Sequence, residues 1–589
     1  MNRKNLTAAV LAGLAGAAGI AGTAQAVNLN PDGLGQVLIY PYYTSNDGND
    51  TLLSVVNTTD SAKAVKVRFK EGYNSREVLD FNMYMSAYDV WVAAIVDGGV
   101  VDPADTGTPH LIIPDSTCTV PYLYEQGLDK GYDWGYQEFL NYDYTGTNAD
   151  GGPTGISRAA EGYFEMIEMG TLTDDTKTKK RLGSAEAATH FIDDDGVQMP
   201  EDCGQLNDNW SNLGGGIGKG MWLEDEDLDI SRNSGGLFGG AAVINVQKGT
   251  MHAYDAKAIQ GYDTKDNGNH FKPGNSHPNL DDGNETTATV FFGVPQNKAV
   301  TMDYASGGYS VDAISAVFMH EYTMNEYNVK HGNKASSEWV LTFPTKRWYV
   351  DDTLLEELDD IWVPNQNDPD CDFWDPVTNT PPYPPRNGPT YNDSTSPPED
   401  SSWELCSYVE KSVSLSEARP PFTDLFDGKA CEVFGMEIWD REENAAEGDD
   451  PDDRPIVSPP PPGGSTPGTP NVMCYEVNVL RFGNAENPVP FKPVFGTTSD
   501  ILLEVDTGLV TYDLGTKSKI RESGWARIDW GFDSDHIDAQ GLVGLPVTGF
   551  WAEQFTNGKQ TDDAGDSIRA NYGGVFDHKA NVRRLAPRD

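Results

Sequence analysis

The strongest structural signal in this 589-residue chain is a two-residue alternation of apolar and polar side chains that starts near Lys63. Val65, Val67 and Phe69 occupy every second position, and each is followed by a basic residue: Lys66, Arg68 and Lys70. Residues 79–85 repeat the alternation. Two is the period of a β-strand, because successive side chains point to opposite faces of a sheet. The pattern therefore predicts half-buried strands in this region.

Shorter apolar runs flank this region at a regular spacing. They are Gln36 to Tyr43, Thr51 to Asn57 and Tyr88 to Val96, and turn residues such as Ser45 to Gly48 separate them. Strands about 10 to 14 residues apart with turns between them are typical of antiparallel sandwiches. The predicted fold class is all-β: an antiparallel β-sandwich (Ig-like) architecture with two sandwiches and long irregular loops.

Further strand candidates follow along the chain, and one stretch has the apolar spacing of a helix, residues 353–361. The strand candidates are Gly162 to Thr171, a hairpin of Ala241 to Gln247 and Met251 to Ile259, Thr287 to Phe292, Ala313 to Val329, Glu338 to Val350 with Pro344 at an edge or bulge, Cys431 to Trp439, Cys474 to Phe482, Ile501 to Val505, Trp525 to Trp530 and Val547 to Trp551.

The first 26 residues have the three parts of a signal peptide. Arg3 and Lys4 give a basic start, an apolar stretch follows, and small residues end at Ala26. An N-terminal membrane anchor is the alternative. No later stretch approaches 18 consecutive apolar residues, so no transmembrane span is expected in the mature chain. We therefore expect an exported protein that is extracellular or at the cell surface, with the periplasm as an alternative.

Composition divides the remainder into two β-rich parts. We expect an N-terminal β-sandwich with long insertions over 27–260, a loop or domain boundary over 261–286, and a C-terminal β-rich domain over 287–589. Insertions rich in Pro and Asp fall near 364–402 and 442–470 in the second part.

The chain is strongly acidic. It has 42 basic and 91 acidic residues, which give a formal charge of −49 at pH 7. Such a field repels nucleic acids and anionic lipids, so neither is expected as a partner. It attracts divalent cations, and it suits saline surroundings, where salt screens the repulsion between carboxylates.

The six cysteines predict disulfides. An even number of cysteines in an exported chain indicates paired sulfurs, although the sequence alone permits 15 pairings. Pairing in chain order would close three long polar segments and stabilise the fold by about 3 to 5 kcal/mol per bridge. The predicted pairs are Cys118 with Cys203, Cys371 with Cys406, and Cys431 with Cys474.

Four segments carry a resemblance to other proteins: Val65 to Phe69, Glu77 to Phe81, Asn325 to Tyr327, and Trp339 to Arg347. They resemble patterns of uncharacterised secreted β-rich proteobacterial proteins. The resemblance implies export and carries no known activity.

Short catalytic motifs are missing from the sequence. It contains no GxSxG, no GxxxxGK[ST], no Rossmann fingerprint and no CxxC, so several common enzyme classes are not supported. His320 and Glu321 begin like a zinc-protease motif, but Met324 stands where the second histidine is required. A buried or cross-strand role is expected for this pair instead. No catalytic or cofactor-binding residue is assigned.

Calcium is the ligand that the sequence supports best. Ca²⁺ needs six to eight oxygen ligands, which short acidic loops can supply. Alternate spacing lets the carboxylates of Asp368, Asp370, Asp372 and Asp375 converge on one ion. Weaker candidates, for which solvated turns or loops are the alternative, are Asp193 to Gly196, Asp281 to Gly283, Asp225 with Asp227 and Asp229, and the group Asp533, Asp535, His536 and Asp538.

A carbohydrate-active protein is also compatible with the composition. A glycoside hydrolase needs two carboxylates about 5 to 10 Å apart across a cleft, but 91 acidic residues offer too many pairs for the sequence to select one. Some tryptophans could form a sugar-binding surface, although a sandwich core explains them equally well: Trp91, Trp134, Trp210, Trp222, Trp348, Trp374 and Trp551.

Two functional hypotheses follow. The first is an exported non-enzymatic extracellular or cell-surface protein with a structural, adhesive or assembly role, stabilised by calcium and partnered by itself or by cell-surface components. The alternative is a secreted carbohydrate-active protein, either a glycan-binding module or a glycoside hydrolase. A hydrolase should have a cleft that holds two carboxylates with separated pKa values, whereas a structural protein should self-associate.

Overall fold

The computed structural model describes residues 26–585 except for internal gaps. The gaps are 130, 193–195, 197, 212–218, 265–267, 294–295, 306–309, 352–353, 355–360, 365–407, 412–417, 442–456, 459–470, 484–490, 508, 512–517, 562–564 and 566. Three predictions fall wholly or mostly outside the described residues. They are the signal peptide, of which only Ala26 is described, the Asp368 to Asp375 calcium loop, and the helix at 353–361, of which only Leu354 and Ile361 are described.

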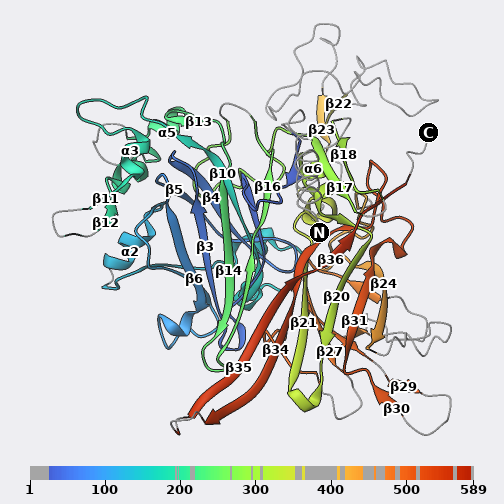
Figure 1. Ribbon diagram of the computed structural model, residues 1–589. Helices are drawn as coiled ribbons and strands as arrows, with labels where there is room; N and C mark the ends of the chain where they lie inside the picture. The colour runs from blue at the N-terminus through green and yellow to red at the C-terminus, as the bar shows by residue number, and fades with distance from the viewer. Residues whose placement is uncertain are drawn as a thin grey trace, which may run out of the picture.

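The N-terminal half forms two facing sheets, drawn in blue and green in Figure 1. Sheet 1 has the order β1-β16-β2-β10-β4-β5-β8, with β13 beside β10. Its strands are β1 (Asn28–Leu29), β2 (Val37–Thr44), β4 (Lys63–Glu71), β5 (Glu77–Met85), β8 (Cys118–Val120), β10 (Glu161–Leu172), β13 (Ile230–Ser231) and β16 (Lys257–Gln260). Sheet 2 has the order β15-β14-β3-β6-β7-β9. Its strands are β3 (Asp50–Asn57), β6 (Val90–Asp97), β7 (Pro109–Ile113), β9 (Gly135–Glu138), β14 (Leu237–Asn245) and β15 (Thr250–Asp255).

The C-terminal half forms a second pair of sheets, drawn mainly in yellow-green, orange and red in Figure 1. Sheet 3 has the order β26-β24-β31-β20-β36, and sheet 4 has the order β25-β28-β27-β21-β34-β35. Sheet 3 comprises β20 (Tyr322–Asn328), β24 (Glu432–Asp440), β26 (Asn471–Met473), β31 (Ser523–Asp529) and β36 (Lys579–Asn581). Sheet 4 comprises β21 (Ala335–Thr342), β25 (Val457–Ser458), β27 (Val477–Gly483), β28 (Leu502–Asp506), β34 (Thr548–Thr561) and β35 (Ser567–Asp577).

Smaller elements decorate the four sheets. The two-stranded pairs are β11 (His190–Ile192) with β12 (Gln198–Pro200), β17 (Thr287–Phe292) with β18 (Lys298–Asp303), β19 (Met319–His320) with β33 (Leu545–Pro546), β22 (Ile361–Pro364) with β23 (Tyr408–Lys411), β29 (Leu509–Thr511) with β30 (Ser518–Ile520), and β32 (Leu542–Val543) with β37 (Arg583–Arg584). The α-helices are α2 (Leu123–Asp129), α3 (Ser184–Ala188), α4 (Cys203–Asn209), α5 (Met221–Glu224), α6 (Ser310–Phe318) and α7 (Arg347–Val350). The 3₁₀ turns are η1 (Asn46–Gly48), η2 (Gly98–Val100), η3 (Tyr142–Tyr144), η4 (Gly146–Asn148), η5 (Ile156–Ala160), η6 (His331–Asn333) and η7 (Trp530–Phe532).

The predicted all-β sandwich architecture is therefore confirmed, and its ladders are mainly antiparallel. Strands β2 to β6 lie within two residues of their predicted bounds, and β14 and β15 form the predicted hairpin. Strands β27 and β28 run parallel. The Ig-like topology and the domain boundary at 261–286 stay predictions.

Sheet 4 contributes to two hydrophobic cores. Its inward residues Trp339 and Leu341 pack against sheet 3. Val340 points to the opposite face and joins the core between sheets 1 and 2, and there Phe550 of β34 stacks on Tyr254 of β15 with ring centroids 4.8 Å apart. The two halves of the chain are thus packed together through the second face of sheet 4.

Sheet 1 is buried on both faces, which corrects the prediction of half-buried strands. All nine residues of β4 are buried, including Lys66, Arg68 and Lys70. The outer face of the sheet is covered by a cluster that includes α6 and β17 and by another that includes residues of α3, α4 and α5. These segments lie 100 residues or more beyond β4 in the chain, so the local alternation does not reveal them.

Two predicted strands turn out to be partly helical. The run predicted as one strand over 313–329 begins with helix α6, and β19 and β20 follow it. All nine residues of α6 are buried, and a short run that is buried on every side has no clear apolar periodicity to separate it from a buried strand. The run predicted over 338–350 ends its strand at Thr342, before Pro344, and closes with α7. Strand β21 lies between β27 and β34, so Pro344 is not in an edge strand.

Among the described helices, none combines the length and the apolar character needed to cross a membrane.

Candidate functional site

A charged cavity of about 800 Å³ opens on the outer face of sheet 1. Its floor is formed by β4, β5 and β10, and its walls come from residues 274–282, from η3 and η4, and from α7. The charged side chains that line the cavity, and one tryptophan beside them, include Arg68, Lys70, Glu77, Asp80, Glu165, Asp281, Asp282, Arg347 and Trp348.

The floor carries a ladder of opposite charges. Arg68 stands in register with Glu165 on one side and with Asp80 on the other. Its Nε donates to Glu77 Oε2 at 2.7 Å, and its Nη1 lies 3.6 Å from Glu165 Oε1. Lys70 Nζ reaches the same Glu77 oxygen at 3.3 Å. Cross-strand pairs of opposite charge stabilise a sheet, and here they also satisfy charges that would be costly to bury alone.

Burial and neighbouring charges separate the pKa values of the cavity carboxyls. Burial alone would raise the pKa of Glu77, but Arg68, Lys70 and Lys66 hold that pKa well below its usual range. Burial raises the pKa of Asp80, and the charge of Glu77 adds to the rise. The Glu77 carboxyl is therefore ionised at neutral pH, and the neighbouring Asp80 carboxyl binds a proton more readily than Glu77 does.

Asp281 on the wall is another carboxyl of the cavity with a strongly shifted pKa. Burial raises its pKa to about 7, against the hydrogen bond that Val311 N donates to it, and Asp282 and Asp312 raise it further. Its neighbour Asp282 accepts hydrogen bonds at 2.8 Å from His277 Nδ1 and at 2.7 Å from Asn279 N. Asp281 and Asp282 therefore each accept hydrogen bonds from protein donors, and the calcium site suggested for them stays a prediction.

A buried ion network beside the cavity connects the two halves of the chain. Arg76 Nη2 and Arg347 Nε approach Asp351 Oδ2 at 2.9 and 3.0 Å. Arg158 binds two carboxylates in bidentate fashion, with Glu71 at 2.7 and 3.0 Å and Asp150 at 2.7 and 2.8 Å. Bidentate pairs fix geometry as well as charge, so the network holds the wall of the cavity in place.

The other predicted metal candidates are occupied by internal contacts or lie outside the described residues. Asp193 to Asp195 are not described. Asp229 accepts hydrogen bonds from Thr176 and Ser184 and pairs with Arg181. The acidic turn at 533–538 was predicted to be solvated, which is wrong for His536. That side chain is fully buried, and its Nε2 lies 2.9 Å from Glu432 Oε2, because the turn folds back against β24.

The His320 and Glu321 pair has the predicted cross-strand role. Glu321 is buried, contacts Arg583 Nε at 2.5 Å, and accepts a hydrogen bond from Asn581. His320 lies on β19, opposite Leu545, and burial lowers its pKa to about 4. Both side chains therefore take part in local contacts between strands.

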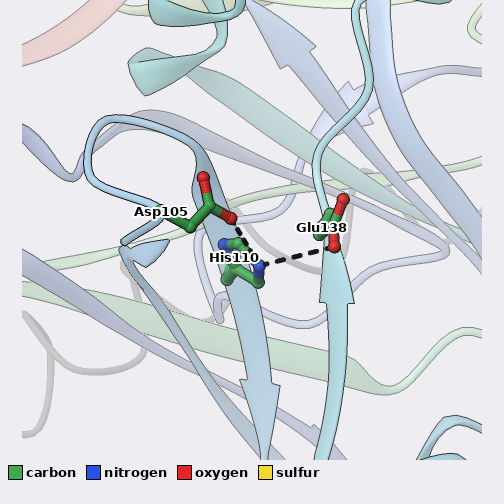
Figure 2. Close-up of side chains that lie close together, drawn as sticks. All are labelled: Asp105, His110 and Glu138. Carbon is green, nitrogen blue, oxygen red and sulfur yellow. Dashed lines mark ion pairs between the residues drawn. The ribbon is translucent and has the colours of Figure 1, made fainter. Parts of the chain in front are cut away.

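One group that the sequence analysis missed has the residue types of a metal site. His110 faces Asp105 and Glu138, as Figure 2 shows, and the possible ligand atoms all lie within 4.8 Å of one another. His110 and Glu138 are partners on adjacent strands. They are 28 positions apart with β8 and α2 between them, so no short motif could have revealed the group.

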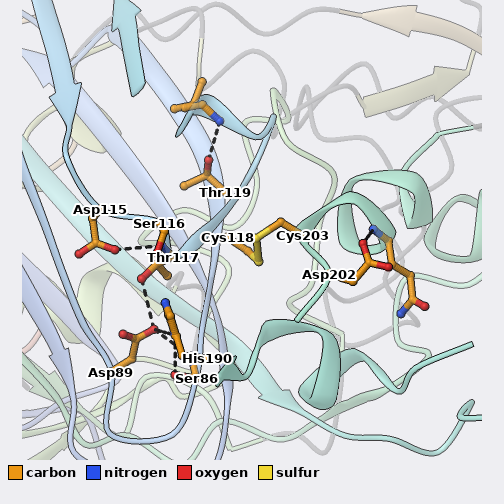
Figure 3. Close-up of a disulfide and its surroundings, with 12 residues drawn as sticks. Ser86, Asp89, Asp115, Ser116, Thr117, Cys118, Thr119, His190, Asp202 and Cys203 are labelled. Carbon is orange, nitrogen blue, oxygen red and sulfur yellow. Dashed lines mark hydrogen bonds and ion pairs between the residues drawn. A yellow bond between two sulfur atoms is a disulfide. The ribbon is translucent and has the colours of Figure 1, made fainter. Parts of the chain in front are cut away.

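Two disulfides join the predicted partners. Cys118 is bonded to Cys203, which ties β8 of sheet 1 to α4 (Figure 3), and Cys431 is bonded to Cys474. Cys371 and Cys406 lie outside the described residues.

A Ser, a His and an Asp lie beside the first disulfide, but they do not form a catalytic triad (Figure 3). Ser86 Oγ is 3.1 Å from His190 Nδ1, and Asp89 Oδ2 is 3.7 Å from the same nitrogen. A triad needs the hydroxyl and the carboxylate on different ring nitrogens. The arrangement therefore supports no nucleophile.

Most tryptophans suggested for a sugar-binding surface belong to the cores. The buried ones are Trp91, Trp210, Trp222 and Trp551. Trp348 and Trp134 are partly exposed, and Trp374 is not described. Trp348 lines the cavity, so it alone of these combines exposure with a concave site in the described part of the chain.

The outer face of sheet 2 is the second notable surface, because it is apolar and exposed. Leu52 is 43% exposed, Val90 48%, Phe238 42% and Met251 53%. The ladder pairs Val56 with both Phe238 and Val90, which makes the patch continuous across β14, β3 and β6. Three acidic residues lie at the margins of this face: Asp50, Asp255 and Glu138, the register partners of Ile244, Gly240 and His110. The outward residues of its central part are Leu52, Ser54, Val56, Val90, Val92, Ala94, Ile112, Phe238, Gly240, Ala242, Ile244, Met251 and Ala253. None of them is charged.

The comparisons with known proteins add no assignment. No protein-family model, no curated protein and no solved structure gives a significant match to this chain. The charged cavity and the outer face of sheet 2 are therefore the features from which a function can be proposed.

Proposed function

We propose that this chain is an exported, non-enzymatic extracellular or cell-surface protein that assembles with copies of itself through the outer face of sheet 2, hereafter the apolar face. The observation that carries the proposal is the exposure of Val90, Phe238 and Met251 in the central part of the outer face of sheet 2, where no outward residue is charged and the acidic residues lie only at the margins. Contiguous apolar patches of several hundred Å² are rare on free surfaces and mark interaction sites.

The size of the apolar face supports a weak, reversible contact. Five strands spaced about 4.8 Å apart, with about six residues of 3.3 Å each, give the face about 500 Å². Two copies in contact would bury about 1,000 Å², the lower end of specific interfaces.

The charge of the chain supports a second copy as the occupant. With a net charge of −49, most surfaces of the molecule repel one another, whereas two faces whose central residues are uncharged can approach. A two-fold axis brings the same patch of both copies together. Added salt should favour the contact, since it screens the repulsion between the acidic surfaces.

Light scattering and sedimentation of the oxidised, mature chain test the proposal. We expect the average mass to rise above the monomer with concentration and with NaCl from 0.05 to 1 M. Phe238→Asp should stay monomeric because it places a carboxylate in the contact. Phe291→Asp is the matched control, since Phe291 is 45% exposed on β17, away from the apolar face. A wild-type chain that is monomeric at about 100 μM in 1 M NaCl, where screening acts over only about 3 Å, would overturn the proposal.

A second candidate function is the binding or hydrolysis of a saccharide in the charged cavity. The observation that favours it is the pairing of separated carboxyl pKa values, low at Glu77 and about 7 at Asp281, with the partly exposed Trp348 on the wall. Aromatic rings and polar side chains that converge in a cavity suit a polyhydroxylated ligand.

Calorimetric titration with a panel of oligosaccharides, together with a reducing-sugar assay, tests this candidate. Trp348→Ala should weaken binding, and Asp281→Asn should abolish hydrolysis if the site is catalytic. Trp525→Ala is the control, because Trp525 is exposed on sheet 3 and stacks on Trp439 instead. Equal binding by the Trp348 and Trp525 variants would exclude the cavity as the sugar site.

A further inference from the structure

The group around His110 has a fixed tautomer. His110 Nδ1 lies 3.1 Å from the carbonyl oxygen of Thr108, which also accepts a hydrogen bond from Gly98 N at 2.7 Å. A carbonyl oxygen can only accept, so Nδ1 carries the proton and donates. The other nitrogen, Nε2, is therefore the one that faces the carboxylates of Asp105 and Glu138.

The contacts of Nε2 leave room for an ion. The nitrogen is 3.6 Å from Asp105 Oδ2 and 4.0 Å from Glu138 Oε1. Both distances are too long for hydrogen bonds, and the described residues offer this nitrogen no other partner. His110 is only 2% exposed, so a largely buried ring directs its Nε2 toward two carboxylates.

These separations, 3.6 and 4.0 Å within a group whose ligand atoms all lie within 4.8 Å of one another, are close to the ligand spacing of a small divalent cation but somewhat wider. Zinc bonds of about 2.0 to 2.2 Å in tetrahedral geometry place neighbouring ligand atoms about 3.3 to 3.6 Å apart. The Asp105 and Glu138 side chains are 36% and 55% exposed. They can therefore move by a few tenths of an ångström, and they leave the site open to an ion from solvent.

The surroundings of His110 hold the ring as a metal ligand is usually held. A histidine ligand commonly donates its second N–H to a backbone carbonyl, which fixes the ring and its tautomer. Gly98 allows the ring to lie against the backbone, since a Cβ at that position would be 2.8 Å from ring atoms Cε1 and Nδ1. The loop before β7 is fixed as well, because Asp97 accepts hydrogen bonds from Gly99 N and Gly107 N at 2.9 and 2.7 Å.

We infer that Asp105, His110 and Glu138 form a binding site for Zn²⁺ or a similar borderline divalent ion. The imidazole nitrogen selects such ions over Ca²⁺, which prefers oxygen ligands only. Three protein ligands leave a fourth position for water or for a ligand group from outside. The inference is independent of self-association and of the cavity, and it adds an ion other than the calcium that the acidic loops predict.

Competition with a chromophoric chelator tests the site on the full mature chain after treatment with EDTA. We expect one Zn²⁺ per chain to bind more tightly than the background of surface carboxylates. His110→Ala should weaken binding by about 100-fold or more, beyond the loss typical of an outer-shell change. Glu138→Gln should weaken it by at least about tenfold without affecting the fold, because Glu138 is exposed. Co²⁺ at the site should give the visible absorption of a tetrahedral centre, which His110→Ala should remove.

His190→Ala is the matched control, because His190 also lies beside one aspartate, Asp89, at 3.7 Å. It should leave both Zn²⁺ affinity and the Co²⁺ spectrum unchanged. The inference is overturned if no stoichiometric ion binds, if Glu138→Gln and His110→Ala bind as the wild type does, or if equimolar Ca²⁺ displaces Zn²⁺.

Discussion

At the scale of single residues, buried ion pairs dominate this acidic chain. Lys63 and Glu168 are both fully buried and 2.6 Å apart, and His536 and Glu432 are equally buried at 2.9 Å. Removal of one partner leaves an uncompensated charge in the interior, which typically costs about 3 to 5 kcal/mol. Each pair therefore constrains which neighbours can be changed.

The pair of His536 and Glu432 should make stability depend on pH. Burial alone would lower the pKa of His536, but Glu432 raises it above its usual value. Burial alone would raise the pKa of Glu432, but His536 and Lys346 lower it. The His536 contribution is complete below about pH 6.5 and is lost as pH rises through its folded pKa. The Glu432 contribution is complete above about pH 4.3 and is lost as pH falls through its folded pKa.

The expected result is that Glu432→Gln destabilises most between about pH 4.3 and 6.5, by about 3 kcal/mol, and less at pH 9. Urea unfolding at pH 5.5 and at pH 9 measures the difference. Glu437→Gln on the same strand is the control, because its partner Arg527 is on the surface. A loss that is the same at both pH values would contradict the assignment.

At the scale of elements, the bond between Cys431 and Cys474 closes the base of the β24–β26 hairpin. Glu432 pairs with Met473 beside it, and the bond spans 43 residues. In the chain-entropy model, a loop of this length is worth about 4 kcal/mol. The segment that it closes is rich in Pro and acidic residues, so the bond restrains a stretch with few apolar residues.

Replacement of both cysteines by serine should lower the free energy of unfolding by about 4 kcal/mol. Urea denaturation of the double variant, compared with the oxidised wild type, gives the value. Reduction of the wild type provides a parallel measurement, although it also opens the bond between Cys118 and Cys203. An unchanged unfolding midpoint in the double variant would show that the bond adds no stability.

The elements also show how far sequence reasoning extends. Strands β4 and β5 were predictable because their alternation is local, and β2, β3 and β6 because turn residues bound their apolar runs. Two of the three predicted disulfides are confirmed, and both follow chain order. Burial of Arg68 was not predictable, since the segments that cover it follow much later in the chain. The cavity combines β4, β10 and α7, and the apolar face depends on which side of β6 and β14 stays uncovered. Such sites exist only after distant segments meet.

At the scale of the whole molecule, the net charge of −49 is the main property. Self-repulsion weakens the compact state. Salt reduces its range from about 10 Å at 0.1 M to about 3 Å at 1 M. The chain should therefore be more stable in concentrated salt than in dilute buffer.

The thermal midpoint should rise by about 1 to 2 °C for each kcal/mol gained between 0.05 and 1 M NaCl, because the entropy of unfolding of so large a cooperative unit makes the shift smaller than in a small domain. Calorimetry at low protein concentration separates this effect from self-association. Sucrose at the same osmolality is the control, because it screens no charge. A midpoint that is constant or falls with NaCl would contradict a repulsion-limited fold.

Sheet 4 has a consequence for cooperativity, because alternate residues of one strand, Trp339 and Val340, belong to different cores. Neither half of the chain can open without exposing apolar side chains of the other. In native-state hydrogen exchange, amides of β21 and of β2 should therefore open with the same free energy, as parts of one foldon. A chain cleaved between residues 261 and 286 should stay together as a non-covalent complex, and the fragments should unfold in a single transition.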